Sequence, residues 1–110
     1  MPAVMGYITA ASMDEAERIG RTLVSEHLAA CANILPGMHS IYRWKGAIET
    51  AEETVLLVKT RPELAEALTA RVKALHSYEV PCVVILPITT GLPEFLRWID
   101  DETSPNHATI

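Results

Sequence analysis

His76 and Cys31 are the two residues of this chain best placed to bind a soft metal ion. His76 comes before Ser77-Tyr78-Glu79 at the expected end of a helix, and Cys31 follows two alanines where a helix gives way to a strand. A selective copper site needs several nitrogen or sulfur ligands, and each residue could supply one. The alternative for His76 is a polar helix end that meets the helix dipole. The alternative for Cys31 is a small buried side chain.

A second group of side chains could bind an organic ligand or bury a subunit contact. Aromatic rings stack on planar molecules, and the ammonium of Lys59 could pair with a carboxylate or a phosphate. The same aromatic residue types are enriched in the buried centres of oligomer interfaces. Both interpretations hold if the ligand cleft lies between subunits. The members of this group are Tyr42, Trp44, Lys59, Tyr78, Glu79 and Trp98.

The sequence lacks motifs of catalysis, so we expect a protein that is not an enzyme. Ser40 and Ser77 have no nucleophile-elbow context, and the five glycines form no phosphate-binding loop. Cys82 lies in the apolar run 80–86 and is expected to be a buried free thiol. Its spacing from Cys31 fits neither a zinc ribbon nor a redox pair. His27, on the apolar stripe of the first helix, is expected to be a core or boundary histidine with its polar atoms satisfied.

Composition restricts the partners and the compartment. The formal net charge is −5 at pH 7, and the nine Lys and Arg residues are scattered singly. We therefore expect no nucleic-acid partner and no membrane anchoring. Because the sequence shows neither a signal-peptide pattern nor a run long enough to span a bilayer, we expect a cytoplasmic protein. The apolar fraction of 49% is high for so small a domain and favours an oligomer over a monomer.

The elements that must position these side chains alternate along the chain. Strands are expected from Met5 to Ala10, from about residue 32 to Trp44, from about Ile48 to Lys59, and from Val80 to Ile88. Capping boxes at Ser12–Glu15 and Thr60–Glu63 begin two amphipathic helices, which end near His27 and Leu75. A short helix follows Pro93, and Thr103 begins a loose tail. The fourth strand is apolar without alternation and is expected to be buried on both faces.

The second and third strands form a hairpin that is too long for its domain. Pro36-Gly37 cannot sit in a regular ladder, so a bend or bulge is expected there. Lys45-Gly46 supplies a residue that tolerates positive φ for the turn. Overhanging strands expose unpaired backbone groups that neighbouring chains can cover. The hairpin therefore predicts assembly.

The element order predicts an α+β, ferredoxin-like βαββαβ fold. Its antiparallel sheet carries two helices on one face, a long bent hairpin of the second and third strands, and a short C-terminal helix. The chain is expected to form a single domain over residues 1–110, with an ordered core of about residues 5–102 and a tail of residues 103–110.

Five sequence blocks resemble the CutA divalent-cation tolerance family over roughly residues 5–102. They are Ala29–Gly37, Ser40–Gly46, Val58–Arg61, His76–Pro81 and Leu96–Ile99. The resemblance implies a homotrimer whose hairpins pair with neighbouring sheets, and a role in the response to divalent metal ions, copper most often. The architecture is similar to that of the PII signalling proteins. The alternative function is therefore a PII-like binding module for a small anionic metabolite or nucleotide in the inter-subunit cleft.

The resemblance also suggests where copper would bind. In some members the ligands are a cysteine at the end of the first strand and a pair of histidines before the Tyr-Glu motif. The first strand of this chain ends in Ile8-Thr9-Ala10-Ala11 without a cysteine, and the pair reads Leu75-His76. His76 is the one match, so His76 and Cys31 are the candidate ligands for copper or another divalent metal.

Overall fold

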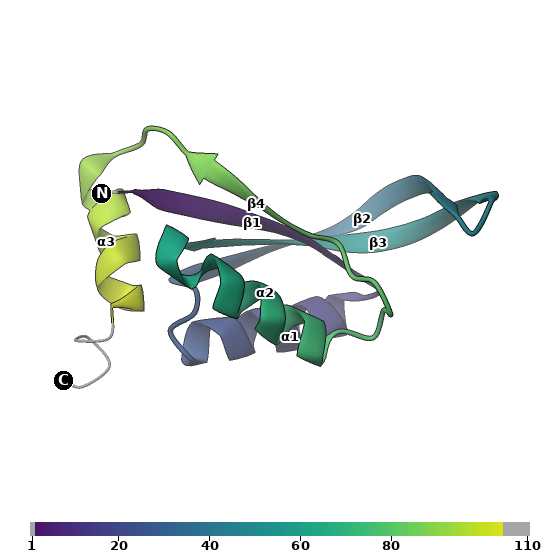
Figure 1. Ribbon diagram of the computed structural model, residues 1–110, viewed down its shortest axis with the longest axis horizontal. Coiled ribbons are helices and arrows are strands. Elements are labelled where there is room, and N and C mark those ends of the chain that lie inside the picture. Colours follow the sequence, from purple (N-terminus) through teal and green to yellow (C-terminus); the bar gives the residue numbers. More distant parts are fainter. Residues whose placement is uncertain (1, 105–110) are drawn as a thin grey trace.

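The computed structural model describes residues 2–104 and contains one four-stranded sheet with helices packed against it (Figure 1). The strands are β1 (Ala3–Ala10), β2 (Cys31–Trp44), β3 (Ala47–Thr60) and β4 (Val83–Ile88). The helices are α1 (Met13–Ser25), α2 (Ala65–Leu75) and α3 (Pro93–Thr103), and a short 3-10 turn, η1 (Pro62–Leu64), precedes α2. No helix of the described residues is long and apolar enough to cross a membrane.

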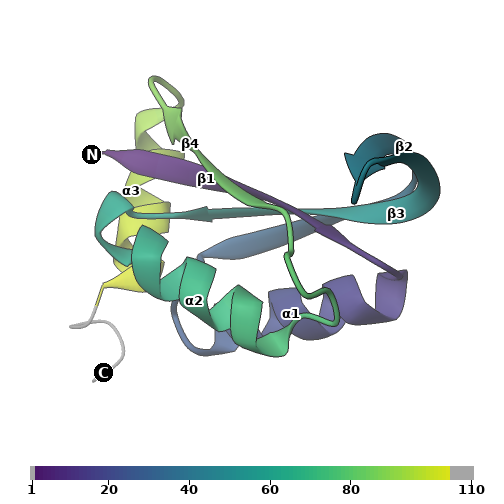
Figure 2. The ribbon, with the colours of Figure 1, turned by 45° about the vertical axis from the view of Figure 1, so that its right-hand side comes forward.

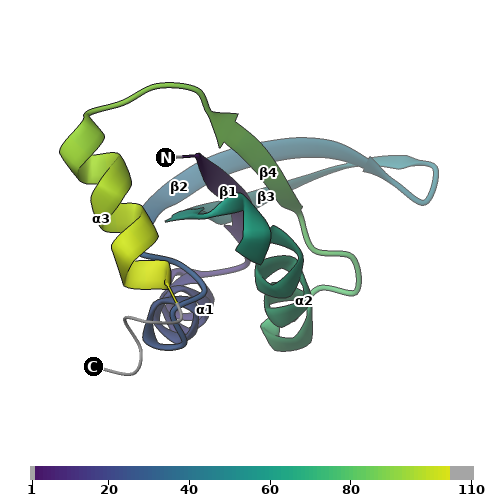
Figure 3. The same cartoon turned by 60° about the vertical axis from the view of Figure 1, so that its left-hand side comes forward.

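The sheet is antiparallel throughout, with the strand order β2-β3-β1-β4. Helices α1 and α2 lie on the same face of it, and α3 crosses the end that is opposite the hairpin tip (Figures 1 and 3). This arrangement confirms the predicted ferredoxin-like fold, including the two helices on one face and the short C-terminal helix. Within residues 2–104, the other face of the sheet carries no helix.

The core fills the space between the sheet and the two helices. Its fully buried side chains come from β1, α1, β3 and α2 and include Ile8, Ile19, Leu56 and Leu68. The apolar stripe of α1 faces this core. Ser12 caps the helix as predicted, and its hydroxyl accepts from the Glu15 amide at 3.1 Å.

The β2–β3 hairpin leaves the sheet and curls away from it (Figure 2). The pairing shifts between Leu35 and Met38, because β2 spends one residue more than β3 over this stretch. The extra residue is a β-bulge at Pro36-Gly37, with Gly37 at a φ of 78°. The turn is made by Lys45 and Gly46, at φ values of 49° and 83°. Both predictions for this hairpin are confirmed.

The prediction that the fourth strand is buried on both faces is wrong. β4 begins only at Val83 and pairs with β1 alone, so it is an edge strand, and its helix-free face is open. Val84 is 49% exposed and Leu86 is 43% exposed. Cys82 precedes the strand and is exposed, which corrects its expected burial. A run without alternation therefore marks a strand that is apolar on its open face.

Two further predictions fail where β3 and α3 run longer than expected. The second capping box does not form, because Thr60 is the last residue of β3 and its side chain is buried in the protein. Thr103 does not begin a tail. It is the last residue of α3, it is buried, and it accepts a 3.1 Å hydrogen bond from Arg61 Nε. The rest of the predicted tail, from residue 105, lies outside the described residues.

Candidate functional site

A pocket of about 700 Å³ lies between residues 38–44 of the β2–β3 hairpin and the segment between α2 and β4. This volume is in the range of small-molecule sites. Four residues of the predicted ligand group line it: Tyr42, Trp44, Tyr78 and Glu79. The other side chains are Tyr7, Thr9, Met38, His39, Ser40, Ile41, Glu53, Val80 and Cys82.

The bulge in β2 decides which side chains reach this pocket. Before the bulge Ile34 pairs with Leu56, so even-numbered β2 residues share the face of the sheet that the helices cover. After it, Met38 pairs with Glu53 and Tyr42 with Glu49. Because side chains alternate along a strand, one extra residue moves the even-numbered side chains to the helix-free face. The bulge thus brings Tyr42 and Trp44 to the same face as Tyr7.

Two hydrogen bonds tie the walls of the pocket together. Tyr78 donates its phenol proton to Glu53 Oε2 at 2.9 Å, which joins the segment after α2 to β3. Tyr7 donates to Met38 Sδ at 3.2 Å, which joins β1 to β2. Burial, reinforced by the bond to Glu53, raises the pKa of Tyr78 above its ordinary value. Tyr78 therefore stays a hydrogen-bond donor, and Glu53 is the acceptor that it orients.

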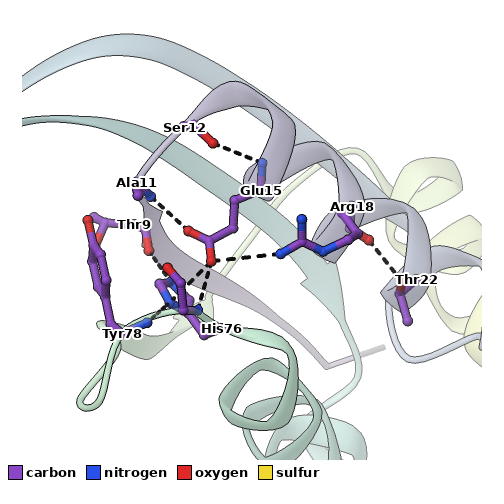
Figure 4. Close-up of polar contacts among 9 residues, drawn as sticks. Thr9, Ala11, Ser12, Glu15, Arg18, Thr22, His76 and Tyr78 are labelled. Carbon is purple, nitrogen blue, oxygen red and sulfur yellow. Dashed lines mark hydrogen bonds and ion pairs between the residues drawn. The ribbon is translucent and has the colours of Figure 1, made fainter.

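A buried glutamate holds the segment that carries Tyr78 (Figure 4). Glu15 accepts from the Ala11 amide through Oε1 at 2.9 Å and from the Ser77 amide through Oε2 at 2.8 Å. Burial acts to raise the pKa of Glu15, but the hydrogen bonds from Ala11 and Ser77 outweigh it and leave the pKa below its ordinary value. The ionised carboxylate links the start of α1 to the end of α2.

His76 belongs to the same network and uses both ring nitrogens within the protein. Its Nδ1 accepts from the Tyr78 amide at 3.0 Å, so the proton must be on Nε2, which donates to the Thr9 carbonyl at 2.7 Å. The side chain has no exposed surface. In this conformation His76 positions the pocket wall and has no nitrogen left to bind a metal.

Cys31, the other predicted ligand, lies elsewhere on the sheet. It pairs with Lys59, and Lys59 pairs with Met5, whereas His76 contacts Thr9. Met5 and Thr9 are four strand residues apart, about 13 Å along β1. Among residues 2–104 no three His, Cys, Asp or Glu side chains gather closely enough to hold a metal ion. The predicted pair of ligands is not brought together, and these residues do not fit a copper site.

Lys59 and Trp98, predicted with the aromatic group, also lie outside the pocket. Lys59 Nζ donates to Asn33 Oδ1 at 2.7 Å and lies 3.7 Å from Cys31 Sγ. Trp98 is on α3, with its ring centroid 5.4 Å from that of Phe95. The expected ammonium for an anionic ligand is therefore absent from the lining, although aromatic rings and Glu79 are present.

Sequence reasoning missed Tyr7 and Glu53 as pocket residues. Glu53 lies in the polar stretch 49–53 of the third strand, a pattern typical of a solvent-facing segment. The available signal was the bulge expected at Pro36-Gly37. The extra residue there pairs Met38 with Glu53, whereas a regular ladder would pair Met38 with the residue before Glu53. The prediction for His27 is confirmed, because its Nδ1 lies 2.9 Å from the Glu102 carbonyl oxygen and the residue is half-buried.

The fold and the site together define a ferredoxin-like α+β protein with a hairpin arm and a pocket along that arm. The sequence model of the family described as CutA1 divalent ion tolerance protein matches residues 4–102. The chain belongs to this family, as the five sequence blocks predicted.

Relatives agree with this assignment. The chain is 50% identical over 95 residues to the divalent-cation tolerance protein CutA of Archaeoglobus fulgidus, covering 86% of this chain and 92% of the relative. It is 42% identical over 103 residues to the chloroplastic protein CutA 1 of Oryza sativa, covering 94% of this chain and 58% of the relative. The chain thus spans little more than half the length of the rice protein. The crystal structure of CutA1 from Oryza sativa superposes with a TM-score of 0.92 at 41% identity, covering 96% of both chains.

Proposed function

We propose that this protein is a cytoplasmic, non-enzymatic homotrimer in the response to divalent metal ions, with the β2–β3 hairpins as contacts between subunits. The name of the Archaeoglobus relative supports the role in cation tolerance. The free thiols of Cys31 and Cys82 agree with a reducing compartment.

The overhanging hairpin is the observation that carries the assembly proposal. β1 pairs with β3 only from Thr54 onward, so residues 47–53 of β3 pair with β2 alone. Every residue from 41 to 50 is exposed, and Ile41 and Ile48 are 68% and 67% exposed. Isolated two-stranded hairpins are marginally stable in water. A hairpin with such apolar side chains gains stability when another chain covers it.

The open edge of β4 provides a complementary surface. β4 pairs with β1 only, so the backbone groups along its other edge are open to a further strand. The side chains of Val84 and Leu86 are exposed on one face of the same strand. The hairpin and β4 lie in different parts of the sheet, as Figure 1 shows. A chain with two different association surfaces, here the hairpin and the open edge of β4, favours a ring of head-to-tail contacts. Such a ring is compatible with three subunits.

Charge substitution in the hairpin tests the proposal. Ile41 and Ile48 lie on the same hairpin face, because Ile41 pairs with Thr50 and Ile48 with the neighbouring Arg43. We expect the Ile41→Lys/Ile48→Lys double variant to dissociate at concentrations where the wild type is assembled. Sedimentation velocity measures this, with circular dichroism as a check on folding. The control is Val24→Lys, which changes an exposed residue of α1 and should leave the assembly intact. An assembled, unchanged double variant contradicts the hairpin contact.

A further inference from the structure

Helix α3 leaves a further apolar surface exposed, which we call the α3 patch and which consists of Leu92, Phe95 and Trp98. Leu92 is 64% exposed, and the rings of Phe95 and Trp98 are 41% and 39% exposed. The two rings lie together, with their centroids 5.4 Å apart. Aromatic side chains are enriched at the centres of protein interfaces, where one partner covers them. The α3 patch is therefore a candidate interaction surface.

The hairpin of the same chain cannot cover this patch. Figure 1 shows α3 at one end of the longest axis and the hairpin tip at the other end, and this axis is 48 Å long. When complementary surfaces lie at opposite ends of a chain, each copy can join the next one head to tail. A second copy of this chain can therefore bring its hairpin to the α3 patch.

Arg43 gives one face of the hairpin a positive charge as well as apolar area. It pairs with Ile48 across the hairpin and follows Ile41 by two residues, so the three side chains share a face. All three are exposed. Within residues 2–104 the guanidinium of Arg43 makes no hydrogen bond or ion pair. Because arginine stacks on aromatic rings and pairs with carboxylates, this hairpin face suits an aromatic surface that has acidic neighbours.

The α3 patch offers this combination of rings and carboxylates. Glu94 comes one helical turn before Trp98 and Asp101 one turn after it, so both carboxylates flank the ring. Both residues are exposed, and neither carboxylate has a hydrogen bond or an ion pair in the described part of the chain. The whole of α3 carries four acidic side chains against one basic side chain. The patch also continues the open surface of β4, since only residues 89–92 separate β4 from α3.

We propose that the α3 patch of one subunit binds the hairpin face of Ile41, Arg43 and Ile48 from the next subunit, with Arg43 against Trp98 and its flanking carboxylates. This inference rests on the proposed homotrimer and names the surface that the hairpin contacts in it. Each chain then gives its hairpin to one neighbour and its α3 patch to the other, as a closed ring of identical head-to-tail contacts requires.

Charge reversal tests the contact on the full chain. We expect Arg43→Glu, and separately Glu94→Lys/Asp101→Lys, to raise by at least about tenfold the protein concentration at which half of the assembly dissociates. The variant that combines all three substitutions should recover most of this loss, because opposite charges meet again. Sedimentation equilibrium measures the dissociation, and circular dichroism checks the folding. The control is Glu17→Lys, on exposed α1, which should assemble as the wild type does. A combined variant in which the two losses simply add overturns the proposal.

Cross-linking tests the same contact without dissociating the assembly. Both native cysteines are first replaced by serine, and Arg43→Cys is combined with either Glu94→Cys or Asp101→Cys. We expect a short bismaleimide to join such chains into covalent trimers on a denaturing gel, whereas the control Arg43→Cys/Glu17→Cys should stay as single chains. A trimeric protein in which neither pair cross-links overturns this contact and leaves the proposed assembly standing. A monomeric wild type contradicts the proposed assembly, and the contact with it.

Discussion

His76 and Glu15 show what the residue scale adds to a motif. A histidine at the end of a helix was a reasonable candidate metal ligand, because the sequence cannot reveal the partners of its ring nitrogens. Those partners, the Thr9 carbonyl and the Tyr78 amide, come from a distant strand and from the loop itself. Likewise Glu15 was predicted only as a helix cap, whereas its carboxylate holds the Ser77 amide 62 residues away. Long-range hydrogen bonds of this kind have no local sequence signal.

Glu15 makes the stability of the protein depend on pH. Its native pKa lies below the ordinary value of 4.5, so its contribution is complete above that value and is lost as the pH falls through the native pKa. We expect Glu15→Gln to lower the free energy of unfolding by about 1–3 kcal/mol at neutral pH, because the amide of Ala11 or that of Ser77 loses its acceptor.

The pH series provides the discriminating measurement. Urea unfolding at a fixed protein concentration should show a shallower loss of stability below pH 4.5 for Glu15→Gln than for the wild type. Glu17→Gln, exposed on the same helix, is the control and should keep the wild-type slope. Parallel slopes for wild type and Glu15→Gln would contradict the role of the ionised carboxylate.

Two buried threonines should respond in opposite ways to the same substitution. The Thr60 hydroxyl has no hydrogen-bond partner among the described residues, whereas Thr103 donates to the Ile99 carbonyl and accepts from Arg61. We expect Thr60→Val to raise the free energy of unfolding by up to about 1 kcal/mol and Thr103→Val to lower it by about 1–2 kcal/mol. Chemical denaturation measures both, and a stability loss in Thr60→Val of the size seen for Thr103→Val would refute the assignment.

At the scale of elements, the hairpin was predictable in outline but not in its consequence. The pair Pro36-Gly37 predicts an irregularity in the strand, and the pair Lys45-Gly46 predicts the turn. The direction in which Tyr42 and Trp44 point depends on a register shift of one residue, which the sequence alone does not give. The prediction for β4 is wrong for a related reason. Its apolar run predicts a strand buried on both faces, whereas the strand order places β4 at the edge of the sheet.

The bulge itself can be tested through Gly37. Its φ of 78° is one that a β-branched side chain rarely adopts. We expect Gly37→Val to lower the free energy of unfolding by about 1–2 kcal/mol, because a valine is strained at this φ. Ser40→Val, in the regular part of the same strand, is the control and should cost less. A Gly37→Val variant as stable as the wild type would contradict the bulge geometry at this position.

At the scale of the whole molecule, the elongated shape favours the proposed assembly. The described chain extends 48 Å along its longest axis and only 27 and 22 Å along the others, because the hairpin projects from the core (Figure 1). Sequence composition predicted additional buried surface, and the exposed isoleucines of the hairpin and the open edge of β4 are where that surface would form. Subunit contacts of this kind would also stabilise the fold, in a way that depends on protein concentration.

The molecular mass in solution tests the central claim of assembly through the hairpin most directly. Sedimentation equilibrium of the wild-type protein at micromolar concentration should give about three times the chain mass of 12.1 kDa. A mass equal to that of one chain under these conditions would contradict the account.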